Sequence, residues 1–222
     1  MPFSNQDSIP TVLYFAQQLK PRRILDVGVG LGIYGMLLRT GLDIAHERMA
    51  KEKWQLRLEG LEIFPAYRNP IWDYAYDTVH IGDARTYAFP ENSFDLILIN
   101  DVLEHLTEAE AIACVHRLLQ FAPTVILTTP VSHIQQGAWG GNPHETHISV
   151  LTPSLFPHLV CTKVTGCTMC CVCCRDPELA EQIRWDSRIA PVSRPEWIPY
   201  ISYRLRRKAR SLIRLVRGGT TQ

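Results

Sequence analysis

The sequence predicts an α/β fold built around a mostly parallel sheet, and three observations lead to this prediction. Short apolar runs alternate with segments whose apolar residues have helical spacing. Glycines or acidic residues follow the ends of several of these runs. The chain has 222 residues, of which 46% are hydrophobic and 20% charged, and this composition excludes a mainly disordered or collagen-like protein.

The first half of the sheet can be followed in order. Apolar residues from Val12 to Leu19 share one face of a first helix, which Pro21 ends. A glycine turn and a helix around residues 36–38 follow the first strand. We expect four strands in this half: residues 23–27, a run that ends at residues 61–63, residues 78–81, and residues 94–99. The run at 94–99 is apolar on both faces, as expected for the central strand of a covered sheet.

The second half begins with Thr107 and Glu110, whose capping-box spacing predicts the start of a helix. A fifth strand is expected at 124–128, and the long loop at 132–147 is of a length that favours a functional role. Two strands at 159–164 and 168–174 should form a hairpin about residues 165–166. Three prolines then mark a linker: Pro191, Pro195 and Pro199.

A glycine turn stands where the first strand meets its helix, with the sequence Asp26-Val-Gly28-Val-Gly30-Leu-Gly32. Glycines there let the backbone approach a ligand closely. A dinucleotide fingerprint would need glycine or alanine where Ile33 stands, and its ribose-binding acid about 20 residues further on. An NAD-dependent oxidoreductase is therefore the alternative prediction and not the preferred one.

Acidic residues stand at the ends of the first three strands, as Asp26, Glu62 and Asp83. The carboxyl ends of parallel strands share one edge, where ligands of open α/β sheets bind. Carboxylates accept hydrogen bonds from ribose hydroxyls and from an ammonium group. We expect Asp26 to hold an ammonium end, Glu62 a ribose diol, and Asp83 with the Ala84 backbone an adenine edge.

These motifs together resemble those of class I S-adenosylmethionine-dependent methyltransferases over residues 9–175, in a bacterial small-molecule or glycan-type branch. The resemblance implies S-adenosylmethionine as cofactor. It also implies a Rossmann-like, mostly parallel seven-stranded sheet with an antiparallel C-terminal hairpin and helices on both faces. The cofactor-binding residues implied are Asp26, Gly28, Gly30, Gly32, Glu62, Asp83, Ala84 and Asn100.

The acceptor side begins at Asn100-Asp101-Val-Leu, which lacks the Asn/Asp-Pro-Pro-Tyr motif of enzymes that methylate planar nitrogens. No Pro-Cys follows the strand, as it does in cytosine-C5 enzymes. A nucleic-acid substrate is therefore disfavoured. The segment from Asp101 to Leu106 resembles small-molecule methyltransferases that act on oxygen, nitrogen or carbon. We predict a small-molecule, glycan or lipid-linked acceptor, methylated at oxygen rather than at a nucleobase.

Asp101, His105 and His147 are the candidate catalytic residues. A histidine titrates near working pH and could take a proton from a hydroxyl acceptor, although His105 could equally begin a helix and bond locally. His144, Glu145 and His147 share the long loop. We rank three roles for His147: a substrate clamp or base is preferred, a structural histidine comes second, and part of a divalent-metal site comes third. No metal ligand is therefore assigned.

Six of the seven cysteines lie between Cys161 and Cys174. Their Cys-x-x-Cys spacings are typical of zinc sites. On a strand, however, Cys171 and Cys173 would face one side and Cys170 the other. We therefore prefer small buried hydrophobic residues to a zinc site.

The net charge of +1 is the sum of −6 over residues 1–199 and +7 over residues 200–222, which hold seven basic residues and no acid. On a helix, residues 200–217 would be basic and amphipathic, suited to an anionic membrane or to docking on protein.

We predict a methyltransferase domain at 1–175, a linker at 176–199 and a tail at 200–222. No signal peptide is recognised, so a cytoplasmic protein with peripheral contact at the inner membrane face is expected. A non-catalytic adaptor that uses the tail is the second alternative.

Overall fold

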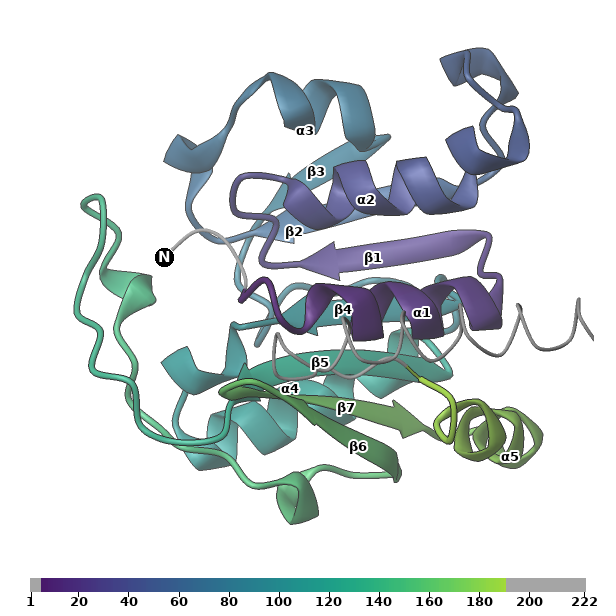
Figure 1. Ribbon diagram of the computed structural model, residues 1–222. Helices are drawn as coiled ribbons and strands as arrows, with labels where there is room; N and C mark the ends of the chain where they lie inside the picture. Colours follow the sequence, from purple (N-terminus) through teal and green to yellow (C-terminus); the bar gives the residue numbers. More distant parts are fainter. Residues whose placement is uncertain (1–4, 191–222) are drawn as a thin grey trace, which may run out of the picture. The chain divides into compact units, whose positions relative to one another are not determined.

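A seven-stranded sheet forms the centre of the computed structural model, which describes residues 5–190 (Figure 1). Its strand order is β3-β2-β1-β4-β5-β7-β6. The first five strands of this order are parallel, while β7 is antiparallel to both of its neighbours. The bounds are β1 Arg23–Val27, β2 Arg57–Glu62, β3 Thr78–Ile81, β4 Leu96–Asn100, β5 Thr124–Pro130, β6 Leu159–Thr165 and β7 Thr168–Cys174. The predicted sheet with its antiparallel C-terminal hairpin is confirmed.

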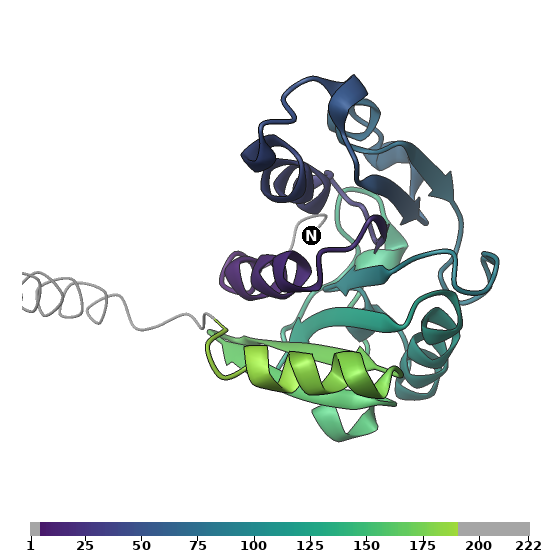
Figure 2. The same cartoon turned by 90° about the vertical axis from the view of Figure 1, so that its right-hand side faces the viewer.

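Helices cover both faces of the sheet (Figures 1 and 2). On one face lie α1 Ile9–Leu19, α2 Ile33–Leu42, α3 Pro70–Ala75 and α5 Pro177–Asp186, and on the other lies α4 Glu108–Phe121. Between them, Leu96 and Leu98 of β4 pack into the first core while Ile97 and Ile99 pack into the second. Every residue of β4 is buried. Because both faces of this strand are covered, its run is apolar throughout, as predicted.

Helix α4 begins with the predicted capping box. The hydroxyl of Thr107 accepts the backbone N–H of Glu110, and the Glu110 carboxylate accepts the backbone N–H of Thr107 at 3.0 Å. Two backbone donors of the first turn are thereby satisfied. The sequence signal and the structure agree at this helix start.

Two helices add to the elements expected from the sequence. Helix α3 begins at Pro70, after Asn69, whose side chain accepts the N–H of Ile71 at 2.8 Å. Helix α5 falls in the segment predicted as a linker. It is capped by Asp176 and buries Ala180 and Ile183 against the first core. The ordered body therefore extends past residue 175. Pro191, Pro195, Pro199 and the tail at 200–222 lie outside the described residues, so the tail's membrane contact and the domain division stay predictions.

The cysteines of β7 alternate between the two cores as predicted. Cys170 and Cys174 pack into the first core, and Cys171 and Cys173 into the second. Burial raises the pKa of the Cys171 thiol to about 11 and that of Cys170 further above its usual range. At neutral pH these thiols are protonated and pack as small apolar groups.

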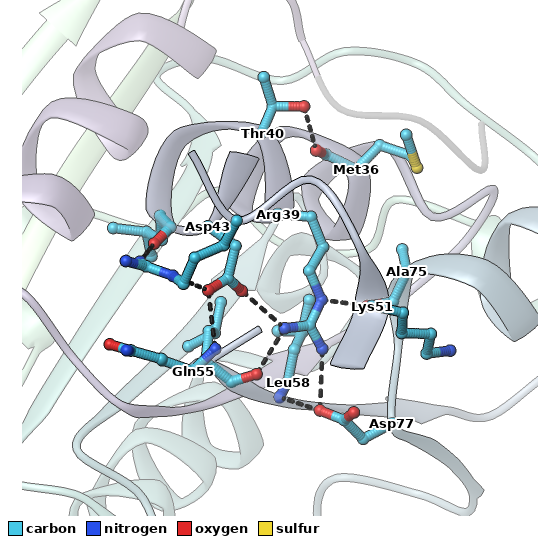
Figure 3. Close-up of polar contacts among 12 residues, drawn as sticks. Met36, Arg39, Thr40, Asp43, Lys51, Gln55, Leu58, Ala75 and Asp77 are labelled. Atoms are coloured by element: carbon cyan, nitrogen blue, oxygen red, sulfur yellow. Dashed lines mark hydrogen bonds and ion pairs between the residues drawn. The ribbon is translucent and has the colours of Figure 1, made fainter. Parts of the chain in front are cut away.

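A buried arginine joins α2 to the strands beside it (Figure 3). Arg39 is fully buried, and its guanidinium donates to Asp43 at 3.0 Å and to Asp77 at 2.8 Å. It also donates to the carbonyls of Ala75, at 2.7 Å, and Leu56. One side chain thereby connects α2 with the segments that enter β2 and β3.

Within residues 5–190, every helix is too short or too polar to cross a lipid bilayer.

Candidate active site

A cavity of about 300 Å³ opens at the carboxyl ends of β1, β2 and β4. It lies where the strand order changes direction between β1 and β4, the place where open α/β sheets bind ligands. A volume of this size suits a small organic ligand. The predicted site residues in its lining are Gly28, Gly30, Glu62, Asp83, Ala84, Asn100, Asp101 and His105, joined by residues 142–146 and Ile148 of the long loop.

The glycine turn forms the floor of this cavity. Gly28 has a φ of +81°, and a Cβ added there would overlap Cγ2 of Val102. Gly30 also has a positive φ and lines the cavity. Gly32 lies outside the lining and packs against Ile71 and Trp72 of α3. Two of the three predicted glycines therefore face the ligand space, and the third fits the turn against a helix.

Glu62 ends β2 and holds the glycine turn in place. Its carboxylate accepts the N–H of Gly30 at 2.8 Å and the N–H of Phe64 at 2.9 Å. Burial raises the pKa of Glu62, although these backbone hydrogen bonds act in the opposite direction. Each carboxylate oxygen has two lone pairs, so both oxygens can still accept from a ligand diol. Glu62 lines the cavity with lone pairs to spare, and its ribose contact stays a prediction.

Asp26 lies under the turn and is absent from the cavity lining. It is 2% exposed, and the Tyr76 hydroxyl donates to its carboxylate at 2.5 Å. Burial, together with the neighbouring charge of Glu62, raises the pKa of Asp26 to about 7, although the hydrogen bond from Tyr76 acts in the opposite direction. Asp26 could therefore act on a ligand's ammonium group only indirectly, through the glycine turn that separates it from the cavity.

The raised pKa of Asp26 predicts a pH-dependent stability. The folded protein binds this proton more tightly than the unfolded chain, so the stabilisation is complete below the ordinary value of 3.8 and is lost as pH rises toward about 7. The loss from this group is about 1.4 kcal/mol per pH unit across that range. Asp26→Asn keeps an acceptor for Tyr76 and should flatten the dependence. Urea unfolding of both proteins at pH 5 and pH 7 checks this, and equal pH slopes would contradict it.

Asp83 and Ala84 form the part of the lining that follows β3. The carboxylate of Asp83 accepts two hydrogen bonds from the Arg85 guanidinium, at 3.0 and 2.6 Å, and Arg85 also pairs with Glu110 at 2.6 Å. These bonds from Arg85 lower the pKa of Asp83. The predicted adenine edge therefore carries a fixed, ionised carboxylate.

Asn100 and Asp101 end β4 at the boundary between the donor and acceptor sides. Both amide atoms of Asn100 are buried and have no hydrogen-bond partner among residues 5–190. A buried amide without partners is costly, so a ligand that supplies them would be stabilised. Asp101 has a φ of +53°, and its carboxylate accepts from Asn5 N–H at 3.0 Å and from the Thr128 hydroxyl at 2.9 Å. Asp101 is thereby held in position.

The long loop forms the wall of the cavity opposite the sheet edge. Tyr67 donates to the carboxylate of Glu145 at 2.7 Å and accepts from the Asn142 amide at 3.1 Å. Gln136 donates to the backbone carbonyl of Glu145 at 2.7 Å. Sequence reasoning did not foresee Tyr67 and Asn142, which anchor the loop to the connection after β2.

His105 lines the cavity and lies beside His147, which is not part of the lining. Their ring centroids are 4.9 Å apart, and His105 Nδ1 lies 3.1 Å from the carbonyl oxygen of Thr146. A carbonyl only accepts, so Nδ1 carries the proton and Nε2 keeps a lone pair in the neutral ring. Burial lowers the pKa of both histidines. The Glu104 carboxylate lies beside them, whereas the loop's own His144 and Glu145 do not join this group.

Residues 25–122 match the methyltransferase domain model. The chain carries an S-adenosylmethionine-dependent methyltransferase domain. This match favours methyl transfer over the NAD-dependent oxidoreductase. No curated protein sequence is significantly similar to the chain.

Solved structures of other proteins have the same fold. PigF with SAH is 17% identical with a TM-score of 0.52, covering 75% of this methyltransferase and 55% of PigF. A SAM-dependent methyltransferase from Aquifex aeolicus is 15% identical with a TM-score of 0.50, over 76% of this chain and 93% of that one. The PH0226 protein from Pyrococcus horikoshii OT3 is 15% identical with a TM-score of 0.51, over 74% and 87% respectively.

The residues of this methyltransferase fit S-adenosylmethionine. The cavity has a close-approach glycine at Gly28, a carboxylate with spare lone pairs at Glu62 and an unpartnered amide at Asn100. When bound, the cofactor supplies an electrophilic methyl group on a sulfonium. Gly28, Glu62 and Asn100 would hold this donor at the strand ends, beside His105 in the same lining.

Proposed function

We propose that this methyltransferase acts on a hydroxyl oxygen of a small-molecule, glycan or lipid-linked acceptor. The observation that carries the proposal is the imidazole of His105, which lines the cavity and has the ring of His147 beside it. Methyl transfer to a hydroxyl forms an O–C bond as the S–C bond breaks, and the hydroxyl must lose its proton. The free lone pair of His105, with His147 beside it, would activate that hydroxyl, while Asp101 fixes the strand end between donor and acceptor.

Exposed apolar side chains on the long loop support an acceptor with an apolar part. Ile134, Trp139 and Ile148 are exposed by 40%, 46% and 55%. Ile148 also lines the cavity, so the apolar surface continues into the site. In Figure 1 this loop, between β5 and β6, extends beyond the edge of the sheet. Contact of residues 200–217 with a membrane belongs to this proposal and would bring the enzyme to a lipid-linked acceptor.

The acceptor class is tested with S-adenosylmethionine carrying a ¹³C-methyl group. The enzyme is incubated with aqueous and with lipid extracts, and each labelled product is isolated. We expect an O-methyl carbon, which ¹³C NMR distinguishes from an N-methyl or S-methyl carbon. Label in the aqueous extract would indicate a small molecule or free glycan, and label in the lipid extract a lipid-linked acceptor. An N-methyl or S-methyl product would overturn the proposal.

His105→Gln is expected to lower kcat at least tenfold with the labelled acceptor, because the amide cannot activate the hydroxyl as the imidazole does. The affinity for S-adenosylmethionine should be unchanged, because His105 is not among the predicted cofactor-binding residues and its ring hydrogen-bonds the carbonyl of Thr146. His116→Gln, at an exposed position on α4, serves as the control and should keep full activity. Calorimetry for donor binding and S-adenosylhomocysteine formation for turnover separate the two effects. An unchanged kcat would contradict the role of His105.

A further inference from the structure

We infer that Glu104, His105 and His147 form a binding site for a divalent first-row transition-metal cation. One potential ligand atom from each of these residues lies within 4.8 Å of the others. Glu104 and His105 belong to the short 3₁₀ turn Leu103–His105 after β4, and His147 comes from the long loop. Two imidazoles and one carboxylate are the ligand set of catalytic zinc sites and of non-haem iron(II) sites, both of which keep open positions for substrate.

Glu104 is the observation that points to a cation. Its side chain is 2% exposed, and the hydroxyl of neighbouring Thr129 hydrogen-bonds its carboxylate. A buried carboxylate is stabilised by an adjacent cation.

The second nitrogen of each histidine is engaged as in metal sites. Ligating imidazoles donate their other N–H to a carbonyl or carboxylate, which fixes the ring and leaves the ligating lone pair free. His105 does this toward the carbonyl of Thr146 at 3.1 Å, and His147 hydrogen-bonds the backbone of Ile134. In a neutral ring that donates one N–H in this way, the other nitrogen keeps the lone pair that binds metal.

Backbone hydrogen bonds hold the two segments together. The carbonyl of Glu104 accepts the N–H of Ile148 at 2.9 Å and the N–H of Ser149 at 3.2 Å. Since His147 directly precedes Ile148, these bonds keep its ring beside Glu104 and His105. The three ligand groups are therefore positioned by backbone contacts and do not depend on a cation to bring them together.

This inference rests on the proposed function and specifies how the histidines activate the acceptor. Three protein ligands leave positions at which the acceptor hydroxyl can coordinate the cation. Coordination lowers the pKa of a hydroxyl, as it does for metal-bound water. The proton then leaves to solvent, the oxygen forms its bond to the methyl carbon, and the carbon–sulfur bond breaks.

The test uses the untagged full-length protein, freed of metal with a chelator and titrated with Co²⁺. We expect one equivalent to bind with the visible spectrum of nitrogen and oxygen ligation. Glu104→Gln, which is isosteric with the protonated carboxyl, and His147→Gln should each weaken Co²⁺ binding about 10- to 100-fold. His144→Gln is the matched control, because His144 shares the loop and the cavity lining but lies outside the cluster.

Three outcomes overturn the site: no Co²⁺ binding, equal affinity in Glu104→Gln and wild type, or a thiolate-to-cobalt charge-transfer band that places the ion at cysteine. Loss of Co²⁺ binding in His144→Gln to the same degree would also overturn it. The proposed function fails separately. If Co²⁺ binds as expected but the labelled product is N-methyl, the cation site stands and the hydroxyl acceptor is wrong. If an O-methyl product forms at full rate in metal-free enzyme that binds no Co²⁺, the acceptor stands and the site is wrong.

Discussion

Replacing Glu62 by alanine is expected to weaken S-adenosylmethionine binding by about 1 to 3 kcal/mol, which is roughly a 5- to 150-fold rise in Kd. Two losses combine in this value. The variant lacks the carboxylate lone pairs that would accept from the ribose diol, and the N–H of Gly30, now bonded at 2.8 Å, loses its acceptor. Because Gly30 lines the cavity, a displaced turn also disturbs the donor's position. Isothermal titration calorimetry with S-adenosylmethionine measures the effect directly.

Glu59→Ala is the matched control for this experiment. Glu59 lies on the same strand, is 6% exposed and pairs with Arg57 and His80, outside the cavity lining. Its replacement should lower stability and leave donor affinity unchanged. Equal affinity in Glu62→Ala and wild type would remove Glu62 from the donor site. Equal weakening in both variants would show that burial on β2, and not the ribose contact, is what the measurement detects.

Most of the sheet could be predicted because strand signals are local. Apolar runs and their flanking glycines located β1, β3 and the β6–β7 hairpin, and the alternation of Cys170 and Cys171 followed from strand geometry. Helix α3 was missed because six residues are too few to show a helical period, although Asn69-Pro70 is a helix-start signal. Helix α5 was taken as linker because the later prolines dominated that segment. Its cap at Asp176 was the available signal.

The donor side of the site could be predicted for a topological reason. Parallel strands end at one edge, so residues far apart in sequence, such as Gly28, Glu62 and Asp83, had to converge. The acceptor side could not be predicted in this way. The meeting of Glu104 with His147 depends on the path of a long loop, which the backbone bonds from Ile148 to the Glu104 carbonyl determine. Burial of Asp26 beneath the turn was equally hidden, because it depends on Tyr76 reaching back from the end of α3.

Arg39→Met is expected to lower the free energy of unfolding by about 3 to 5 kcal/mol, the range for removing one member of a buried ion pair. The Arg39 side chain is fully buried, and Asp43 beside it is also fully buried. Methionine fills similar space but leaves the carbonyls of Ala75 and Leu56 without their donor. Asp43 keeps its bonds from Arg48 at 2.9 Å and from the Gln55 N–H at 2.8 Å, which limits the loss. Urea unfolding followed by circular dichroism measures the change.

The control for this loss is an arginine in an exposed ion pair. Arg184 pairs with Glu181 at 3.1 Å on α5, with side chains 54% and 76% exposed, and Arg184→Met should change stability by less than about 1 kcal/mol. A second variant, Asp77→Asn, tests the charge at the rim of the cluster, where the carboxylate is 41% exposed and accepts from Arg39 and from the Leu58 N–H. Its effect should lie between the other two. If Arg39→Met lowered the free energy of unfolding no more than Arg184→Met does, the buried ion pairs of Arg39 would stabilise the fold no more than apolar packing at the same place. Since Arg39 connects α2 to the segments entering β2 and β3, its loss should also reduce donor affinity through the glycine turn that precedes α2.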